Sequence, residues 1–108
     1  MAVHRYFRCG FAEKVYQDAM EVEFQLRGIP YKREVPIHAT YCGVQLDSTF
    51  IPDFICYDDI VVELKAVKEL EDYQRSQTIN YGKVAEAKVA LLINFGEPSL
   101  RYERFVTE

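Results

Sequence analysis

The chain of 108 residues is 49% hydrophobic and 28% charged, and its formal net charge is −4. This length supports one hydrophobic core, so we expect a single domain over residues 1–108, and the composition excludes a disordered chain. No apolar run reaches the roughly 18 residues that span a bilayer, and the charged N-terminal residues argue against a signal peptide.

Three cysteines, Cys9, Cys42 and Cys56, are odd in number and far apart. They favour the reduced thiols of a cytoplasmic protein over a disulfide framework, and they form no C-x-x-C metal pair. The acidic balance does not favour nucleic acid, because proteins that hold phosphates are usually basic. A site that binds divalent cations would reverse the sign locally.

The first predicted element is a helix at residues 12–27. Its apolar residues recur at steps of three and four, which places them along one face. They are Ala12, Val15, Ala19, Val22 and Leu26. Gly28 is expected to end the helix in a left-handed conformation, and Pro30 prevents the helix from resuming.

A strand is predicted at residues 31–41, because apolar and polar side chains alternate there. Cys42 and Gly43 predict a tight turn into a second strand at residues 44–50, where the alternation continues. The two segments together are typical of a β-hairpin.

Pro52 interrupts the second strand, because proline lacks the amide hydrogen that a ladder needs. We expect a bend or bulge there and a short continuation at residues 54–57 before a turn at two aspartates. Residues 60–67 follow as a third strand. This strand is apolar on both faces except for Glu63 and Lys65, which is typical of the middle of a sheet.

Residues 70–87 predict a second helix, and residues 88–95 predict a buried fourth strand. A strand, a helix and a strand at this spacing imply a right-handed crossover, so the third and fourth strands should be parallel. Residues 101–106 predict a short edge strand. The expected architecture is an α/β fold with a mixed sheet flanked by helices.

Glu63 and Lys65 are two positions apart on a strand, so their side chains leave the same face. Burying both charges costs several kcal/mol per ion unless each is paired or coordinated. Asp53 precedes the turn at Asp58 by five residues and Glu63 follows it by five, which makes the two carboxylates near cross-strand neighbours. Such a pair requires a shared proton or a cation, and hard oxygen ligands favour Mg²⁺ or Mn²⁺. A simple Glu–Lys ion pair, or a strand end open to solvent, is the alternative.

Asp53 after a proline, followed by Glu63-x-Lys65, resembles the signature of the PD-(D/E)xK nuclease superfamily. The order of elements is similar to its restriction-endonuclease-like core (α-β-β-β-α-β). The resemblance implies that Asp53, Glu63 and the main-chain carbonyl of Leu64 hold a divalent metal. It also implies that Lys65 orients the attacking water or stabilises charge during phosphodiester hydrolysis.

Gln77-x-x-x-Tyr81 places an amide and a phenol one turn apart on the second helix. This pair resembles the Q-x-x-x-Y element of the RecB-like branch, in which such residues line the catalytic cleft. The alternative is a core-facing Tyr81 with an incidental Gln77. The iron–sulfur cysteines of that branch are absent, so a role that depends on a cluster is not implied.

Gly10, Glu13 and Tyr16 resemble the G-x-x-E-x-x-Y element that names a family of small bacterial proteins in this superfamily, and the similarity extends through most of residues 10–96. A first-helix glutamate often adds to the metal site there, so Glu13 is a further candidate ligand. Its alternative role is to favour the helix dipole. Family members usually carry more helix upstream, which predicts exposed apolar surface here for a partner or a second copy.

His4 and His38 are expected to be solvated, because one lies near a terminus and the other on the polar face of a strand.

The leading hypothesis is a Mg²⁺- or Mn²⁺-dependent nuclease that acts on DNA ahead of RNA. A homodimer or helper protein is expected to help it bind the nucleic acid. The rival is an inactive nuclease-fold module with a binding or regulatory role. A glycosidase that uses two carboxylates as acid and base ranks last, because it leaves Lys65 and Gln77 without a role.

Overall fold

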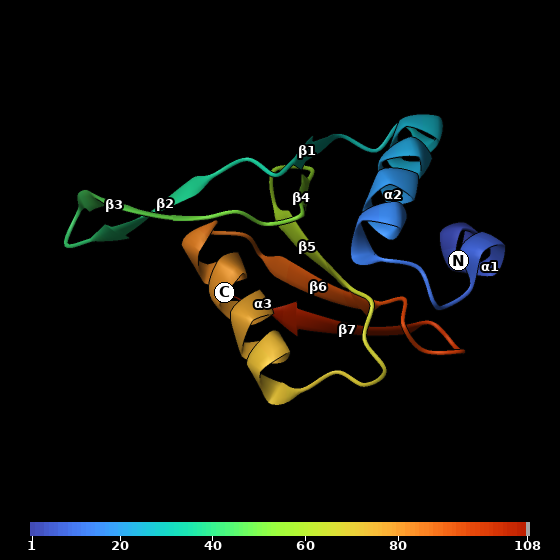
Figure 1. Cartoon of the computed structure of the whole chain (residues 1–108). Helices are drawn as coiled ribbons and strands as arrows, with labels where there is room; N and C mark the ends of the chain where they lie inside the picture. Colours follow the sequence, from blue (N-terminus) through green and yellow to red (C-terminus); the bar gives the residue numbers. More distant parts are fainter. Residues whose placement is uncertain (108) are drawn as a thin grey trace.

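The computed structural model describes residues 1–107 and consists of helices around a mixed sheet, with a separate hairpin (Figure 1). The elements in chain order are α1 (Ala2–Phe7), α2 (Glu13–Arg27), β1 (Tyr31–Arg33), β2 (Ile37–Tyr41), β3 (Val44–Phe50), β4 (Phe54–Cys56), β5 (Ile60–Lys65), α3 (Asp72–Val84), β6 (Val89–Asn94) and β7 (Arg101–Val106). No helix among the described residues is both long enough and apolar enough to cross a membrane.

The main sheet has five strands in the order β1-β4-β5-β6-β7. β5 is its central strand, antiparallel to β4 and parallel to β6, as the predicted crossover requires. β7 pairs antiparallel with β6 and occupies the predicted edge position. The predicted α/β class, a mixed sheet flanked by helices as in restriction-endonuclease-like cores, is confirmed.

Helices α2 and α3 lie on opposite sides of this sheet (Figure 1). Val62 and Leu64 of β5 pack with buried residues of α2, whereas Val61 packs in a second cluster with Tyr81 of α3. Successive side chains of a strand point to opposite faces, so Glu63 leaves the sheet on the same side as Val61. The predicted charged pair of β5 therefore lies on the face that α3 covers.

The predicted first helix is confirmed as α2, but its core-facing side differs from the predicted apolar stripe. Tyr16, Met20 and Phe24 are buried, while Val22 and Leu26 are 52% and 75% exposed. The large side chains at steps of four remove more apolar area from water than the aliphatic stripe does. Gly28 ends α2 with a φ of 67°, as predicted.

The strand predicted for residues 31–41 is divided in two. β1 pairs with β4 of the main sheet, whereas β2 pairs with β3 in a hairpin that extends away from it (Figure 1). Glu34 has a φ of 53° between the two strands, and Pro36 restricts the residue before it. The alternation of side chains continues across this break, so the pattern does not reveal it. The predicted turn at Cys42 and Gly43 is confirmed.

α1 is a short helix that the sequence did not predict. It buries His4, whose Nε2 lies 2.9 Å from the main-chain oxygen of Glu97. The expectation that His4 is solvated is therefore wrong, whereas His38 is exposed as predicted. Six residues are too few for a stable isolated helix, so packing against α2 is what holds α1 in place.

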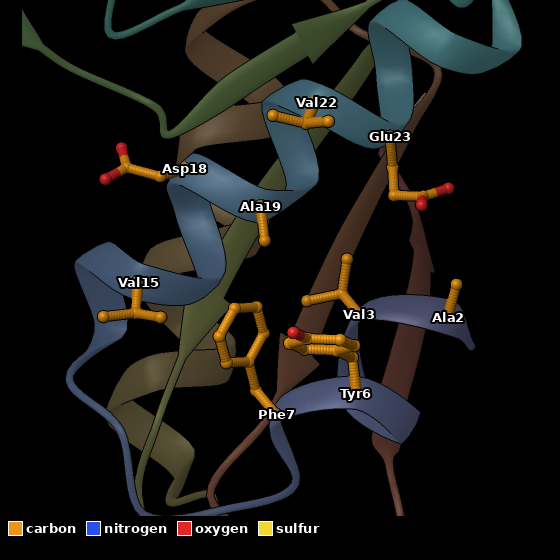
Figure 2. Close-up of a pocket in the computed structure, with 9 residues that line it drawn as sticks. All are labelled: Ala2, Val3, Tyr6, Phe7, Val15, Asp18, Ala19, Val22 and Glu23. Carbon is orange, nitrogen blue, oxygen red and sulfur yellow. The ribbon is translucent and has the colours of Figure 1, made fainter.

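Residues of α1 and α2 line an apolar groove of about 550 Å³ where the two helices meet (Figure 2). Val3 and Phe7 of α1 face Val15 and Ala19 of α2 across it, and the acidic Asp18 and Glu23 lie at its rim. The exposed apolar surface that we predicted near the N-terminus is thus present.

Candidate functional site

The pairing of β4 with β5 brings Asp53 and Glu63 together. Phe54 pairs with Val62, so the preceding residue, Asp53, falls opposite Glu63. The Asp53 Oδ2 atom accepts a hydrogen bond of 2.7 Å from the amide of Leu64. The main-chain oxygen of Asp53 also accepts one of 3.1 Å from the amide of Glu34. Asp53 is therefore held from both sides, and one of its carboxylate oxygens is not needed for these bonds.

Glu63 is a buried carboxyl group with an unsatisfied oxygen. Its side chain is 3% exposed, and its Oε1 atom has no hydrogen-bond partner among the described residues. Burial, and next the charge of Asp53, raise the pKa of Glu63 to about 9, while Lys65 opposes this shift. Buried polar atoms nearly always have partners, so an orphaned oxygen in a native site calls for an explanation such as a bound ion.

Lys65 and Glu13 complete the charged surroundings of this pair. Lys65 is half-buried and forms no ion pair with any residue of the described part of the chain, so the predicted alternative of a Glu63–Lys65 salt bridge is not formed. Glu13 stands at the start of α2. Partial burial, and next the charge of Asp53, raise the pKa of Glu13, and Lys65 lowers it. The charges of Asp53 and Lys65 thus act on both Glu13 and Glu63.

The donor set fits a divalent cation only in part. Within residues 1–107, no three His, Cys, Asp or Glu side chains are arranged so that they could hold one ion. Two carboxylates do converge, however, and the orphaned oxygen of Glu63 supplies a hard ligand without a competing partner. The carbonyl of Leu64, next along β5, is the remaining candidate. Carboxylate and carbonyl oxygens are the ligands that Mg²⁺ and Mn²⁺ prefer.

Gln77 and Tyr81 lie one turn apart on α3, on the side of the sheet that bears Glu63. Gln77 Nε2 is 3.4 Å from the Tyr81 hydroxyl, and the Tyr81 ring meets Phe50 of β3 edge-on at 5.5 Å. Tyr81 is half-buried and packs against the cluster of Val61, as the alternative of a core-facing Tyr81 requires. Within the described chain, no hydrogen bond joins Gln77 or Tyr81 to Asp53 or Glu63.

The G-x-x-E-x-x-Y segment has a clear structural role. Tyr16 is fully buried, stacks on Phe95, and donates a hydrogen bond of 2.6 Å to the main-chain oxygen of Arg8. Its hydroxyl also accepts one from the amide of Phe11. Tyr16 thereby fixes the loop before α2, in which Gly10 has a φ of 112°. This anchoring fixes where α2, with Glu13 in its first turn, begins.

Two buried polar residues near the site were not among the predicted ones. Gln17 donates to the carboxylate of Glu34, whose amide in turn holds Asp53. Asn94, fully buried at the end of β6, bonds both the amide and the carbonyl of Val67 just beyond Lys65. Gln17 follows Glu13 by one helical turn on the same face, which is the signal that could have identified it.

Comparison with known proteins agrees with this geometry. Residues 1–105 match the family model described as the PD-(D/E)XK nuclease superfamily. No curated protein matches the chain. Nucleases of this superfamily generally use divalent metals and bind nucleic acid. The matched region includes both converging carboxylates and Lys65.

Proposed function

Because the chain belongs to the PD-(D/E)XK nuclease superfamily, we propose that it is a Mg²⁺- or Mn²⁺-dependent nuclease that hydrolyses phosphodiester bonds in DNA, ahead of RNA. The observation that carries this proposal is the orphaned oxygen of buried Glu63 beside Asp53 on the central strand. A protein that used this pair only for stability would gain by giving that oxygen a partner.

Each residue has a distinct role in the proposal. Asp53, Glu63 and the carbonyl of Leu64 would hold the divalent ion. Glu13, a further ligand in the sequence prediction, forms no three-carboxylate cluster with Asp53 and Glu63 among the described residues, so it would act on the ion through its charge alone. When bound, such an ion lowers the pKa of water and neutralises phosphoryl charge. Lys65, unpaired on the same strand face as Glu63, stabilises the negative charge that grows on the phosphoryl oxygens or orients the water.

Gln77 and Tyr81 are proposed to line the cleft on the α3 side, where their polar groups position the substrate. An amide and a phenol are neutral hydrogen-bonding groups, so they can orient a substrate without repelling its phosphates. The bond between them holds both side chains in one arrangement. Their contribution is therefore to orientation.

Several finer assignments belong to the same proposal. We place the chain in the G-x-x-E-x-x-Y family on the strength of Gly10, Glu13 and Tyr16, and treat residues 1–108 as one nuclease-like domain. A cytoplasmic location is supported by its three free cysteines. A homodimer or helper protein would supply the positive charge for phosphate binding, because the net charge of this chain is −4.

The test is a cleavage assay on single- and double-stranded DNA and RNA with Mg²⁺ or Mn²⁺. Asp53→Ala and Lys65→Ala should each lower the rate by at least about 100-fold, as the loss of one charge-stabilising group usually does. Lys88→Ala, which removes an exposed lysine paired with Asp59, is the matched control and should keep full activity. Equal activity in all variants would identify a contaminating nuclease and refute the proposal.

The rival function is an inactive module that binds or regulates another protein. The net charge of −4 and the lack of a three-ligand cluster within residues 1–107 favour it. Calorimetric titration separates the two functions. The nuclease binds Mn²⁺ with a stoichiometry that Asp53→Ala abolishes, whereas the rival shows no binding at millimolar metal.

A further inference from the structure

A second groove lies between the hairpin and α3, and its lining is unlike the rest of the surface. It has a volume of about 640 Å³, within the range of small-ligand sites. Its principal side chains are aromatic or amide-bearing and none of its lining is charged: Phe50, Tyr73, Gln77, Asn80 and Tyr81. In a chain that is 28% charged, an uncharged surface of this kind calls for a ligand with few charges of its own.

The groove is built on a face of α3 that the sheet does not use. Four lining residues share one face of α3, because Ser76, Gln77 and Asn80 follow Tyr73 by three, four and seven positions. The core-facing positions of α3 are instead Gln74, Thr78 and Gly82. Tyr73 is 66% exposed, although it is the kind of side chain that gains by being covered.

The opposite wall is the projecting hairpin, which Phe50 joins to α3. The edge-on contact between Phe50 and Tyr81 fixes the spacing of the two walls. Gln77 and Tyr81 belong to this groove and also to the side of the sheet that bears Glu63. Gln77 and Tyr81 are thus shared by this groove and the proposed cleft.

We infer that this groove binds unpaired nucleobases of a single-stranded nucleic acid and leads that strand to the site at Glu63. Exposed aromatic rings stack on bases of any sequence, and amides bond their edges. A phosphate would require cations, which the lining lacks, and in a duplex the faces of the bases are already stacked on one another. The inference rests on the proposed function and specifies its substrate as single-stranded.

The test measures binding by fluorescence anisotropy with a short oligothymidine, a duplex and an abasic strand of equal length, in metal-free buffer. Tyr73→Ala should weaken oligothymidine binding about tenfold or more, as expected for the loss of one base–aromatic stack. Tyr102→Ala is the matched control, because Tyr102 is also 66% exposed but lies on edge strand β7. The abasic strand, with the same phosphates, should bind as weakly as oligothymidine binds Tyr73→Ala.

Three results would overturn the inference. Wild-type protein could bind the abasic strand as tightly as oligothymidine, or Tyr73→Ala and Tyr102→Ala could weaken oligothymidine binding equally. In the third result, Tyr73→Ala weakens duplex binding as much as it weakens oligothymidine binding. Cleavage by the same preparations distinguishes this failure from failure of the proposed function. If Asp53→Ala abolishes metal-dependent cleavage while Tyr73→Ala leaves oligothymidine binding unchanged, the base-binding groove is refuted and the proposed nuclease function stands.

Discussion

The two faces of β5 differ in whether their buried groups all have suitable partners. On one face, Val62 and Leu64 are buried among apolar side chains that include those of α2. On the other face, Glu63 is equally buried, yet one of its oxygens has no partner among the described residues. The strand therefore gains stability from its apolar residues, Val61 on the face of Glu63 included, and loses some at Glu63. Departures from good packing and pairing of this kind are expected at functional sites.

Leu64→Ala tests the packed face and should have the largest effect on stability. Leu64 is fully buried, so its truncation leaves a cavity and should cost roughly 3–5 kcal/mol of the free energy of unfolding. Urea denaturation measures this loss. The matched control is Leu26→Ala on the exposed side of α2, which should change stability by no more than about 0.5 kcal/mol. Similar losses in both variants would mean that Leu64 does not lie in a packed core.

Asn94→Ala tests how the strand end that carries Lys65 is held. Asn94 pairs in register with Lys65, and its side chain bonds the amides of Val67 and Gly96. Removing it leaves partly buried amide donors unsatisfied, which should cost about 1–3 kcal/mol. Chemical denaturation gives this cost, and Asn80→Ala on the exposed face of α3 is the control. Unchanged stability in Asn94→Ala would show that other contacts hold the C-terminal end of β5 in place.

Glu63→Gln tests the unsatisfied face through its pH dependence. The pKa of Glu63 is about 9 in the folded protein and close to 4.5 in the unfolded chain, so the folded state binds the additional proton between these values. The stability of metal-free protein should therefore fall as the pH rises from about 5 to about 9, by at most about 1.4 kcal/mol per pH unit. Glu63→Gln removes this contribution, so the variant should melt above wild type at pH 8.

Thermal melts of both proteins at pH 6 and pH 8 in a chelating buffer measure the difference. Other titrating groups are common to both proteins and cancel. Mn²⁺ should raise the melting temperature of wild type more than that of Glu63→Gln, because a ligand that binds only the folded state stabilises it. Parallel pH profiles for the two proteins would mean that Glu63 is not buried in this way.

The relative placement of Asp53 and Glu63 was easier to predict from the sequence than the chain around them. Asp53 and Glu63 could be matched because a tight turn at Asp58 fixes the register by simple counting. The two faces of β5 follow from strict alternation, so the shared face of Glu63 and Lys65 was equally accessible.

What could not be predicted depends on contacts distant in sequence. α1 has too few residues to be stable alone and depends on packing against α2. No local sequence pattern indicates this packing. The break between β1 and β2 leaves the alternation intact, so the separate hairpin, and with it the groove against α3, was not visible. The role of Gln17 could not be predicted, because it depends on the hydrogen bond from the amide of Glu34 to Asp53.

The most direct measurement is anomalous diffraction from crystals soaked in Mn²⁺. The proposed metal site predicts one peak at coordination distance from both Asp53 and Glu63, with the formerly unpartnered Glu63 oxygen among the ligands. Saturating Mn²⁺ with no peak between these carboxylates, or a protein group found bonded to that oxygen, would contradict it.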